Sequence, residues 1–391
     1  ITLVRQQLNW PYPPFEIPTD IYAVWDAKEQ GKNDEADWQH HYDNYKKSYP
    51  ELASEFERRM QGKLPVNFAT QIAELLQEAG QQTNALATRQ VNTLVLEKLA
   101  PIFPEFLGGS ADLSGSNGTL WSNAQLLSQH NSNADYIHYG VREFGMAAIM
   151  NGLALHRGFI PFGGTFLVFL SYNASAVRMS ALMRQRVIHI FTHDSIALGE
   201  DGPTHQPVEQ LALLRAIPQL SMWRPCDAIE GIVAWQMALE NQQAPTALCM
   251  TRQKLPLQSR SAQQIEQIKC GAYILYEPAK PVEVILIATG SEVVLAMEAA
   301  KRSDKNVRVV SMPSTDKFAE QDEAYRQLVL PAAISKRIAI EAGSSDFWYR
   351  YVGTNGQVIG LDCFGLSAPI NDVFNALNFT VDHILAVIAS L

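Results

Sequence analysis

Tyr136-Ile137-His138-Tyr139-Gly140-Val141-Arg142-Glu143 is a short apolar strand, a turn and the start of a helix that is rich in Ala and Gly. The helix extends to about His156. Further strands are expected on both sides of this stretch, at Phe106–Leu107, Val187–Phe191, Leu220–Trp223 and Thr246–Thr251. Helices with one apolar face lie between them, including one that Thr88 can cap. This alternation predicts an α/β fold with a mostly parallel, doubly wound sheet.

The alternation divides the chain into three regions. Residues 1–60 have the character of a tail and linker, because 9–14 are Pro-rich and 27–50 are polar with no steady period. Residues 61–258 form the first α/β domain. A stretch at 256–268 is rich in Gln, Ser, Arg and Pro, and the alternation restarts after it with a strand at Val282–Ala288. Residues 259–391 are therefore expected to form a second, smaller α/β domain.

Composition restricts the class of function. The 391 residues are 47% apolar and 18% charged, which is ordinary for a globular enzyme. The net charge of −9, with no long basic run, argues against nucleic acid or an anionic membrane as partner. The four Cys are scattered, so free thiols are expected rather than a disulfide framework or a zinc site. No apolar run approaches membrane-spanning length and no signal peptide opens the chain, so a cytoplasmic setting is expected.

Candidate functional residues follow the predicted strands. In open parallel sheets, ligands bind beyond the carboxyl ends of the strands. Asp112 follows the strand at 106–107, Glu143 follows 136–139, His193 and Asp194 follow 187–191, and Arg252 follows 246–251. These side chains are therefore expected on the edge of the sheet where a site should form.

Two of these features have an ordinary structural explanation as well as a functional one. Glu143 in the first turn of a helix can simply complement the helix dipole, but a carboxylate entering a close-packed apolar seam needs a specific partner. Phe166, Phe169 and Tyr172 recur every three residues, which fits a core stripe as well as a pocket wall. The residues by themselves leave both alternatives open.

Histidines and arginines supply further candidates. His193, Asp194, Asp201 and His205 lie close in sequence, but their spacing fits no common zinc pattern, so no metal site is assigned. His205 follows a Gly-Pro-Thr turn that would present it on a loop. Two arginines with a serine between them in sequence could clamp a phosphate, although a single arginine is more often a surface residue. These three residues are Arg89, Ser116 and Arg252.

The junction Ile287-Ala288-Thr289-Gly290-Ser291-Glu292, in the second domain, passes from a strand through a turn into a helix. Its amide groups could hold an anion. Such junctions are common in α/β proteins, so no catalytic role is assigned to this one.

Four segments resemble transketolases, and together they extend over essentially the whole chain. Tyr139–Met146 is similar to the family's pyrimidine-domain signature, and Thr192–Ile196 with Gly199–Pro207 is similar to its substrate-loop motif. Gly108–Leu113 and Phe364–Pro369 are similar to further family segments.

The resemblance implies an activity and its partners. Transketolases transfer a two-carbon ketol unit from xylulose 5-phosphate to ribose 5-phosphate or erythrose 4-phosphate in the pentose phosphate pathway. They use thiamine diphosphate and a divalent metal, Mg²⁺ or Ca²⁺, and the chemistry belongs to the cofactor. They are homodimers in which the cofactor lies between two subunits, and the Ala- and Gly-rich helix after Glu143 fits such an interface.

The resemblance also implies roles for individual residues. Glu143 would hydrogen-bond the cofactor's aminopyrimidine ring, Asp112 would border its thiazolium side, and three aromatic residues would form its pocket: Phe166, Phe169 and Tyr172. Asp201 and His205 would bind the sugar hydroxyls and the reacting end, with His205 assigned to proton transfer. The expected contacts to the sugar phosphate are Arg89, Ser116, His193 and Arg252.

The chain also departs from the family pattern. Residues 162–165 carry Gly where bulkier residues are usual, which could alter loop flexibility or sugar preference. The family's Gly-Asp-Gly…Asn motif, which binds diphosphate and metal, is absent. We therefore expect the N-terminal domain to be missing, with 8–26 as its end and a separate N-terminal domain as a partner. The chain would then be a fragment or a split subunit that is inactive by itself.

The same residues also fit two alternatives to transketolase. One is another thiamine-diphosphate transferase, such as dihydroxyacetone synthase or the deoxyxylulose-phosphate synthase group. The segment 142–145 and the spacing from Ser195 to Glu200 favour transketolase over the latter. The other alternative is a non-catalytic, complementing half-subunit.

Overall fold

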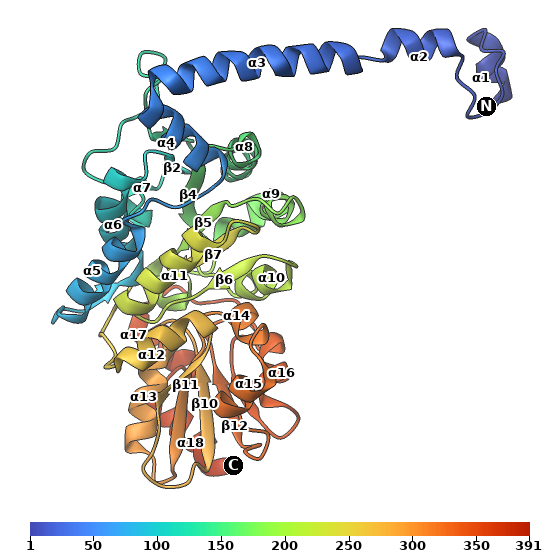
Figure 1. Ribbon diagram of the computed structural model, residues 1–391. Coiled ribbons are helices and arrows are strands. Elements are labelled where there is room, and N and C mark those ends of the chain that lie inside the picture. Colours follow the sequence, from blue (N-terminus) through green and yellow to red (C-terminus); the bar gives the residue numbers. More distant parts are fainter. The chain divides into compact units, whose positions relative to one another are not determined.

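The structure is a computed structural model that describes residues 1–391, and it divides into two units, Ile1–Gln61 and Gly62–Leu391 (Figure 1). The first unit consists of four helices: α1 (Thr2–Gln7), α2 (Thr19–Trp25), α3 (Lys28–Ser48) and α4 (Pro50–Met60).

Helix α3 occupies a segment for which the sequence predicted no regular structure. Trp38 stacks on Tyr42 one turn later, with ring centroids 5.2 Å apart. Tyr42 in turn hydrogen-bonds Glu57 of α4 at 3.0 Å. Neighbouring side chains thus stabilise a helix that lacks an apolar period.

The first sheet has six strands in the order β3-β2-β4-β5-β7-β6, and every pair is parallel. Its strands are β2 (Phe106–Ser110), β3 (Tyr136–His138), β4 (Ile160–Phe166), β5 (Ile188–Thr192), β6 (Ser221–Trp223) and β7 (Thr246–Met250). The doubly wound parallel sheet predicted from the sequence is confirmed. Two short strands, β1 (Leu86–Ala87) and β8 (Lys254–Leu255), pair antiparallel beside it.

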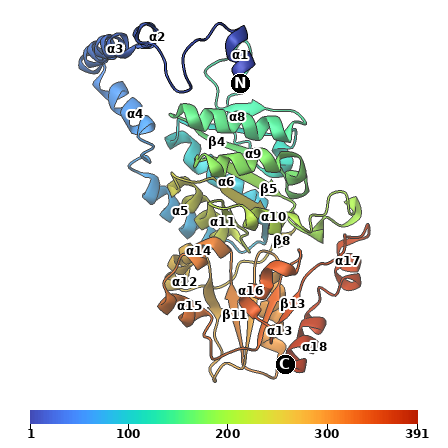
Figure 2. The same cartoon turned by 90° about the vertical axis from the view of Figure 1, so that its right-hand side faces the viewer.

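Helices cover both faces of this sheet. Figure 1 shows α8 (Glu143–His156), α9 (Leu170–Leu182) and α10 (Gln210–Ala216) along one side. On the other side lie α5 (Phe68–Gly80), α6 (Thr88–Leu99) and α11 (Ala228–Glu240). In Figure 2, α8 and α9 lie next to each other across this domain. The short α7 (Ser114–Asn117) follows β2.

Strand β4 was not predicted, because Pro161, Gly163 and Gly164 break its apolar pattern. All seven of its residues are nevertheless buried. A side chain at Gly164 would come within 2.8 Å of Thr119 and 2.9 Å of Asn117. The glycines at 163 and 164 therefore lie inside a strand and allow close packing there, rather than belonging to a loop.

The second sheet has the order β13-β12-β10-β11-β9. Its strands are β9 (Tyr273–Tyr276), β10 (Val284–Ala288), β11 (Val307–Ser311), β12 (Arg337–Ile340) and β13 (Gln357–Ile359). All pairs are parallel except the edge pair of β9 with β11, and β9 was not predicted. The helices of this domain are α12 (Ala262–Gln267), α13 (Glu292–Arg302), α14 (Thr315–Ala319), α15 (Glu323–Val329), α16 (Tyr349–Val352), α17 (Ile370–Ala376) and α18 (Val381–Ser390).

The segment Ile370–Ser390 has a mean hydropathy of 1.4 and, by length and composition alone, could cross a membrane. No apolar run of this length was predicted from the sequence. In the structure this segment is two helices, α17 and α18, separated at 377–380. Neither helix reaches the roughly 20 residues that a membrane span requires. Four of its side chains are buried in the largest apolar core: Val373, Phe379, Ile384 and Ile388.

Candidate active site

The carboxyl ends of the six parallel strands meet at one edge of the first sheet, which gathers residues that are far apart in sequence. Neighbouring strands lie about 4.8 Å apart, so the side chains that follow them line one face. In strand order, the residues at or just after these ends are Glu143, Asp112, Phe166, His193, Arg252 and Arg224.

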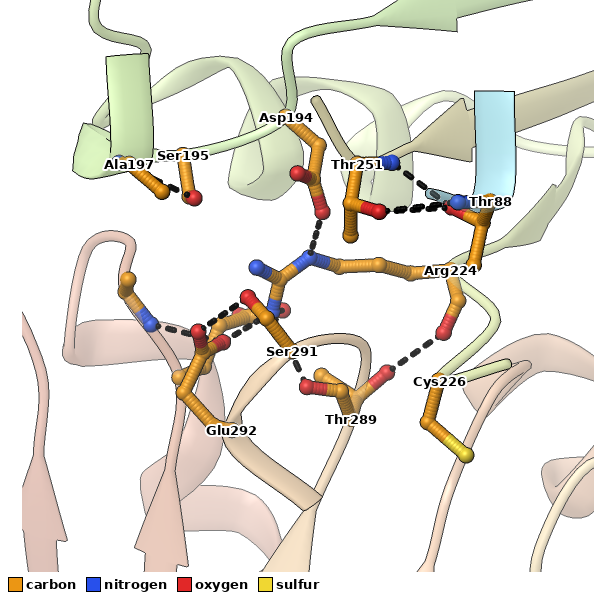
Figure 3. Close-up of polar contacts among 12 residues, drawn as sticks. Thr88, Asp194, Ser195, Ala197, Arg224, Cys226, Thr251, Thr289, Ser291 and Glu292 are labelled. Carbon is orange, nitrogen blue, oxygen red and sulfur yellow. Dashed lines mark hydrogen bonds and ion pairs between the residues drawn. The ribbon is translucent and has the colours of Figure 1, made fainter. Parts of the chain in front are cut away.

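Two arginines lie close together at this edge because their neighbours are joined by hydrogen bonds. The amide of Thr88 donates to the Thr251 hydroxyl at 3.0 Å, and the amide of Thr251 donates to the Thr88 hydroxyl at 2.7 Å (Figure 3). Arg89 and Arg252 are the next residues along the chain. Thr88 was expected to cap α6, but its hydroxyl is used in this pairing instead.

The arginines form an electropositive group without a counterion. Burial lowers the pKa of Arg89, and the charge of Arg252 lowers it further. Arg89 donates from Nη1 to the Ser116 carbonyl oxygen at 2.6 Å, while its buried Nε has no partner. Neither arginine forms an ion pair with an acidic side chain. A buried donor that has no partner and lies near a second guanidinium group is suited to bind an anionic ligand.

His193 belongs to the same group and is held neutral. Burial lowers its pKa to about 3, and the charges of Arg89, Arg252 and His205 contribute to that shift. The Thr192 hydroxyl donates to the side-chain oxygen of Asn117 at 2.6 Å, and it lies 2.8 Å from His193 Nδ1. Since a hydroxyl has one proton to donate, Nδ1 must be the donor in the second contact. The lone pair of the neutral ring is therefore on Nε2.

The three predicted aromatic residues do lie together, but not as a helical stripe. Phe166 ends β4, Phe169 lies in a 3-10 turn, and Tyr172 is in α9. Phe166 stacks on His193 with centroids 3.7 Å apart, and Phe169 lies parallel to Phe166 at 5.7 Å. His205 meets the edge of Phe169 at 5.6 Å. These rings form one shelf against the two histidines, whereas Tyr172 is 66% exposed.

Glu143 is the first residue of α8, as the sequence predicted. Its side chain is 8% exposed and has no hydrogen-bond or ion-pair partner within the protein. The helix dipole favours a negative charge there, but only part of the cost of burying a carboxylate is offset in this way. The position therefore suits a carboxylate that has a ligand as its partner.

Asp112 and Asp201 stand apart from the contacts described so far. Asp112 follows β2 and is exposed, in a left-handed conformation with φ of +63°. Asp201 is an exposed residue at the end of the 3-10 turn Ile196–Asp201. No hydrogen bond, ion pair or ring contact joins either residue to the arginines or the aromatic shelf.

No group of three or more His, Cys, Asp or Glu residues is arranged to hold a metal ion. All four cysteines are free; Cys226 and Cys249 are buried, Cys270 is partly buried and Cys363 is exposed.

Arg224 was not among the functional residues predicted from the sequence. This residue follows β6, so the rule that selected the other strand ends would have selected it too. Its side chain is fully buried and donates from Nε to Asp194 at 2.8 Å (Figure 3). Arg224 therefore lies directly beneath the loop that carries His193.

Three family models match successive parts of the chain. The one described as "Transketolase, thiamine diphosphate binding domain" matches residues 1–65, and "Transketolase, pyrimidine binding domain" matches 84–258. "Transketolase-like TK C-terminal domain" matches 271–380. With the parallel sheet and the site at its edge, these matches define the class: a chain built from transketolase-type α/β domains.

Curated relatives and solved structures define the family more narrowly. The chain is 52% identical to transketolase 1 of Vibrio cholerae and 50% identical to transketolase 1 of Escherichia coli, over 98% and 99% of this chain and 58% of each relative. The transketolase structure from Leishmania mexicana aligns with a TM-score of 0.89 and 38% identity, covering 97% of this chain and 56% of that one. The chain belongs to the transketolase family.

The expectation that the N-terminal domain is missing is wrong, because residues 1–65 match the thiamine diphosphate binding domain. The absence of one short motif led to that error. The expectations of an inactive fragment and of a separate N-terminal domain as partner are not supported either. The chain spans 58% of the length of the curated relatives it matches.

Proposed function

We propose that this protein transfers a two-carbon ketol unit from xylulose 5-phosphate to ribose 5-phosphate or erythrose 4-phosphate, with thiamine diphosphate as cofactor. The observation that carries the proposal is the group of Arg89, Arg252 and His193, which has no acidic counterion and lies beside an aromatic shelf. A sugar phosphate supplies the negative charge that this group lacks.

Glu143 and the aromatic shelf fit the aminopyrimidine end of the cofactor. Glu143 is nearly buried and has no partner in the protein, so its carboxylate is available to a ring nitrogen. Phe166 and Phe169 offer parallel faces to a flat ring, Tyr172 completes the pocket, and Asp112 borders the thiazolium side. When bound, the cofactor supplies the nucleophilic carbon and the electron sink for ketol transfer.

The phosphate of the sugar is placed between the two guanidinium groups. Its charge offsets the repulsion from the guanidinium groups, but burial is the larger cause of the low pKa of His193, so the ring stays neutral and its Nε2 can accept a hydrogen bond from the ligand. The Ser116 hydroxyl has no partner within the protein and supplies a further donor.

The loop at 201–205 provides the groups for the reacting end of the sugar. His205 Nδ1 lies 2.9 Å from the Thr204 hydroxyl, which leaves Nε2 for proton transfer to and from the substrate. Asp201, exposed on the same loop, is suited to bind sugar hydroxyls.

The divalent cation of the family, Mg²⁺ or Ca²⁺, finds no group of ligands in this structure.

We also propose a homodimer, because large apolar side chains of α8 and α9 remain exposed. They are Phe144, Ile149 and Leu155 of α8 and Leu182 of α9, with exposed fractions of 54%, 49%, 52% and 62%. Exposed apolar surface of this kind marks interaction sites. A molar mass near twice that of the chain in light scattering supports the dimer, and a monomer at micromolar concentration contradicts it. With its cysteines free, the protein suits a reducing, cytoplasmic setting.

Glu143→Gln tests the catalytic assignment. Ketol transfer is measured with thiamine diphosphate, Mg²⁺, xylulose 5-phosphate and ribose 5-phosphate. The substitution keeps the size of the side chain but removes its charge, and it should lower the rate about 100- to 10,000-fold without changing the melting temperature. The matched control is Glu51→Gln, which changes an exposed carboxylate in the first turn of α4.

Two outcomes would contradict the proposal. If the parent protein shows no transfer from xylulose 5-phosphate to any aldose phosphate, the activity is wrong. If it transfers only to formaldehyde, dihydroxyacetone synthase is the better assignment.

A further inference from the structure

Buried charges connect the second domain to the loop that carries His193. The Arg224 side chain extends between Asp194 and Glu292, which is the first residue of α13 in the second domain (Figure 3). It donates from Nε to Asp194 at 2.8 Å and from Nη1 to Glu292. All three side chains have no exposed surface.

The second domain fixes the orientation of the guanidinium group. Glu292 also accepts from the Ser291 hydroxyl at 2.6 Å and from the amide of Ala342 at 3.1 Å. Arg224 Nη1 donates in addition to the Thr289 carbonyl oxygen at 3.1 Å. A side chain at Gly290 would come within 2.8 Å of the guanidinium, so Arg224 packs against bare backbone. The junction that the sequence suggested for an anion is thus occupied by an arginine side chain.

Asp194 connects the fixed guanidinium group of Arg224 to His193, its neighbour in sequence. His193 has φ of +60°, a left-handed conformation that costs a residue other than glycine about 1–3 kcal/mol. Such a conformation persists only where surrounding contacts hold it. The ion pair of Asp194 with Arg224 fixes the chain immediately after His193, and the stack on Phe166 fixes the ring itself.

The second domain contacts the same loop at its other end. Gln206 donates from Nε2 to the carbonyl oxygens of Gly199 and Leu366, both at 2.9 Å. The Ser367 hydroxyl donates to the Glu200 carbonyl oxygen at 2.6 Å. Gly202 lies so close to Ser367 that an added side chain would meet it at 3.0 Å. Residues 366–367 therefore hold the part of the loop that carries His205.

We propose that the second domain positions the substrate loop, residues 193–206, through Glu292 and Arg224 at one end and Ser367 at the other. These are positioning residues, because they act through Asp194 and the loop backbone rather than on the substrate. The proposal rests on the proposed function in one respect only: the ligand of His193 is taken to be the phosphate of a sugar.

A contribution to stability alone would be a simpler role for these charges, but it makes a different prediction. Buried ion pairs often add little net stability, because desolvation offsets the attraction between the charges. If Glu292 only stabilised the fold, its removal would lower the melting temperature and leave ligand binding at the His193 end unchanged. Positioning predicts that both change together.

Glu292→Ala and Glu292→Gln separate these roles. In the Glu292→Gln variant the new amide oxygen can accept from Arg224 and Ala342, while the NH₂ group donates to Ser291, so this isosteric change keeps the geometry. Calorimetry with inorganic phosphate should show about tenfold weaker binding in Glu292→Ala and near-parent binding in Glu292→Gln. The control is Glu277→Ala, which removes a carboxylate from buried Arg308 elsewhere in the second domain and should leave phosphate binding unchanged.

Two further measurements test the same proposal: an NMR titration of His193 in Glu292→Ala and amide exchange in Ser367→Ala. The NMR titration of His193 should move toward the ordinary histidine range in Glu292→Ala, because a displaced ring leaves the two arginines. Ser367→Ala removes only an exposed hydroxyl and should fold; amide exchange at 199–206 should become faster in this variant.

The possible outcomes bear on different proposals. If Glu292→Ala binds phosphate as tightly as the parent protein and its His193 titrates as in the parent, the proposal is overturned. If Glu292→Ala does not fold, the proposal is overturned by an unchanged rate of amide exchange at 199–206 in Ser367→Ala. A parent protein that binds no phosphate contradicts the proposed function instead, and the His193 titration still tests positioning.

Discussion

His193 combines most of the constraints that define the candidate site. Its backbone is left-handed, its ring stacks on Phe166, and its Nδ1 proton is directed to Thr192. Burial and two neighbouring guanidinium groups keep the ring uncharged at neutral pH. The residue therefore contributes shape and a hydrogen-bonding edge, while Arg89 and Arg252 contribute the charge.

Arg252→Met should raise the pKa of His193, because it removes one of the positive charges that lower it. The pKa should remain below the ordinary value of about 6.5, since burial is the larger cause. An NMR titration of the histidine ring protons measures this change, and Lys254→Met, two residues along the chain, is the control. A pKa that stays the same or falls would show that Arg252 does not face the ring.

At the scale of elements, the absence of a side chain at Gly164 of β4 allows Asn117 to pack closely against the first sheet. A side chain at Gly164 would press on Asn117, whose side-chain oxygen accepts from Thr192. The bare strand thus allows Asn117 to orient the Thr192 hydroxyl and, through it, His193.

Gly164→Ala should therefore destabilise the protein by about 1–3 kcal/mol through overpacking and should weaken phosphate binding by displacing Asn117. Denaturant unfolding and calorimetry measure the two effects. Gly115→Ala is a matched control, because its added methyl group meets nothing within 4 Å. Equal stability of the two variants would show that β4 can relax to accept the methyl group.

At the scale of the whole molecule, two neutral buried histidines make stability depend on pH. Burial lowers the pKa of His189 to about 3, and that of His193 falls to about the same value. Below about pH 6.5 the unfolded chain takes up protons that these folded rings do not. The free energy of unfolding should therefore fall as the pH falls from about 6.5 toward 3, by about 1.4 kcal/mol per pH unit for each histidine.

Asp194 acts in the opposite direction over part of this range. Burial raises its pKa from 3.8 to about 6, so between these values the folded state binds a proton that the unfolded state lacks. Its contribution therefore rises as the pH falls from about 6 and offsets one of the two histidines. Urea unfolding at neutral pH and at mildly acidic pH measures the balance.

His189→Gln should make the free energy of unfolding depend less steeply on pH below about pH 6.5, by about 1.4 kcal/mol per pH unit. The substitution His130→Gln, at an exposed histidine, should leave this dependence unchanged. An unchanged profile in His189→Gln would show that His189 is protonated in the folded state.

The sequence by itself determined the α/β class, most strand positions and the strand ends where functional side chains gather. These features depend on apolar runs and helical periods, which are local. It failed at β4 and β9, where glycines or an edge position weaken the pattern, and at α3, where no apolar period exists. Its error over residues 1–65 came from relying on one missing motif.

Only the tertiary structure decided which side chains meet. Thr88 pairs with Thr251, Arg224 with Asp194 and Glu292, and Glu143 with no residue of the protein. The reason is physical: a charge or a hydrogen bond depends on distance and burial in space, and partners separated by dozens of residues leave no period in the sequence. The residue types at the site could thus be read from the chain, whereas their partners, their protonation and the role of the second domain required the fold.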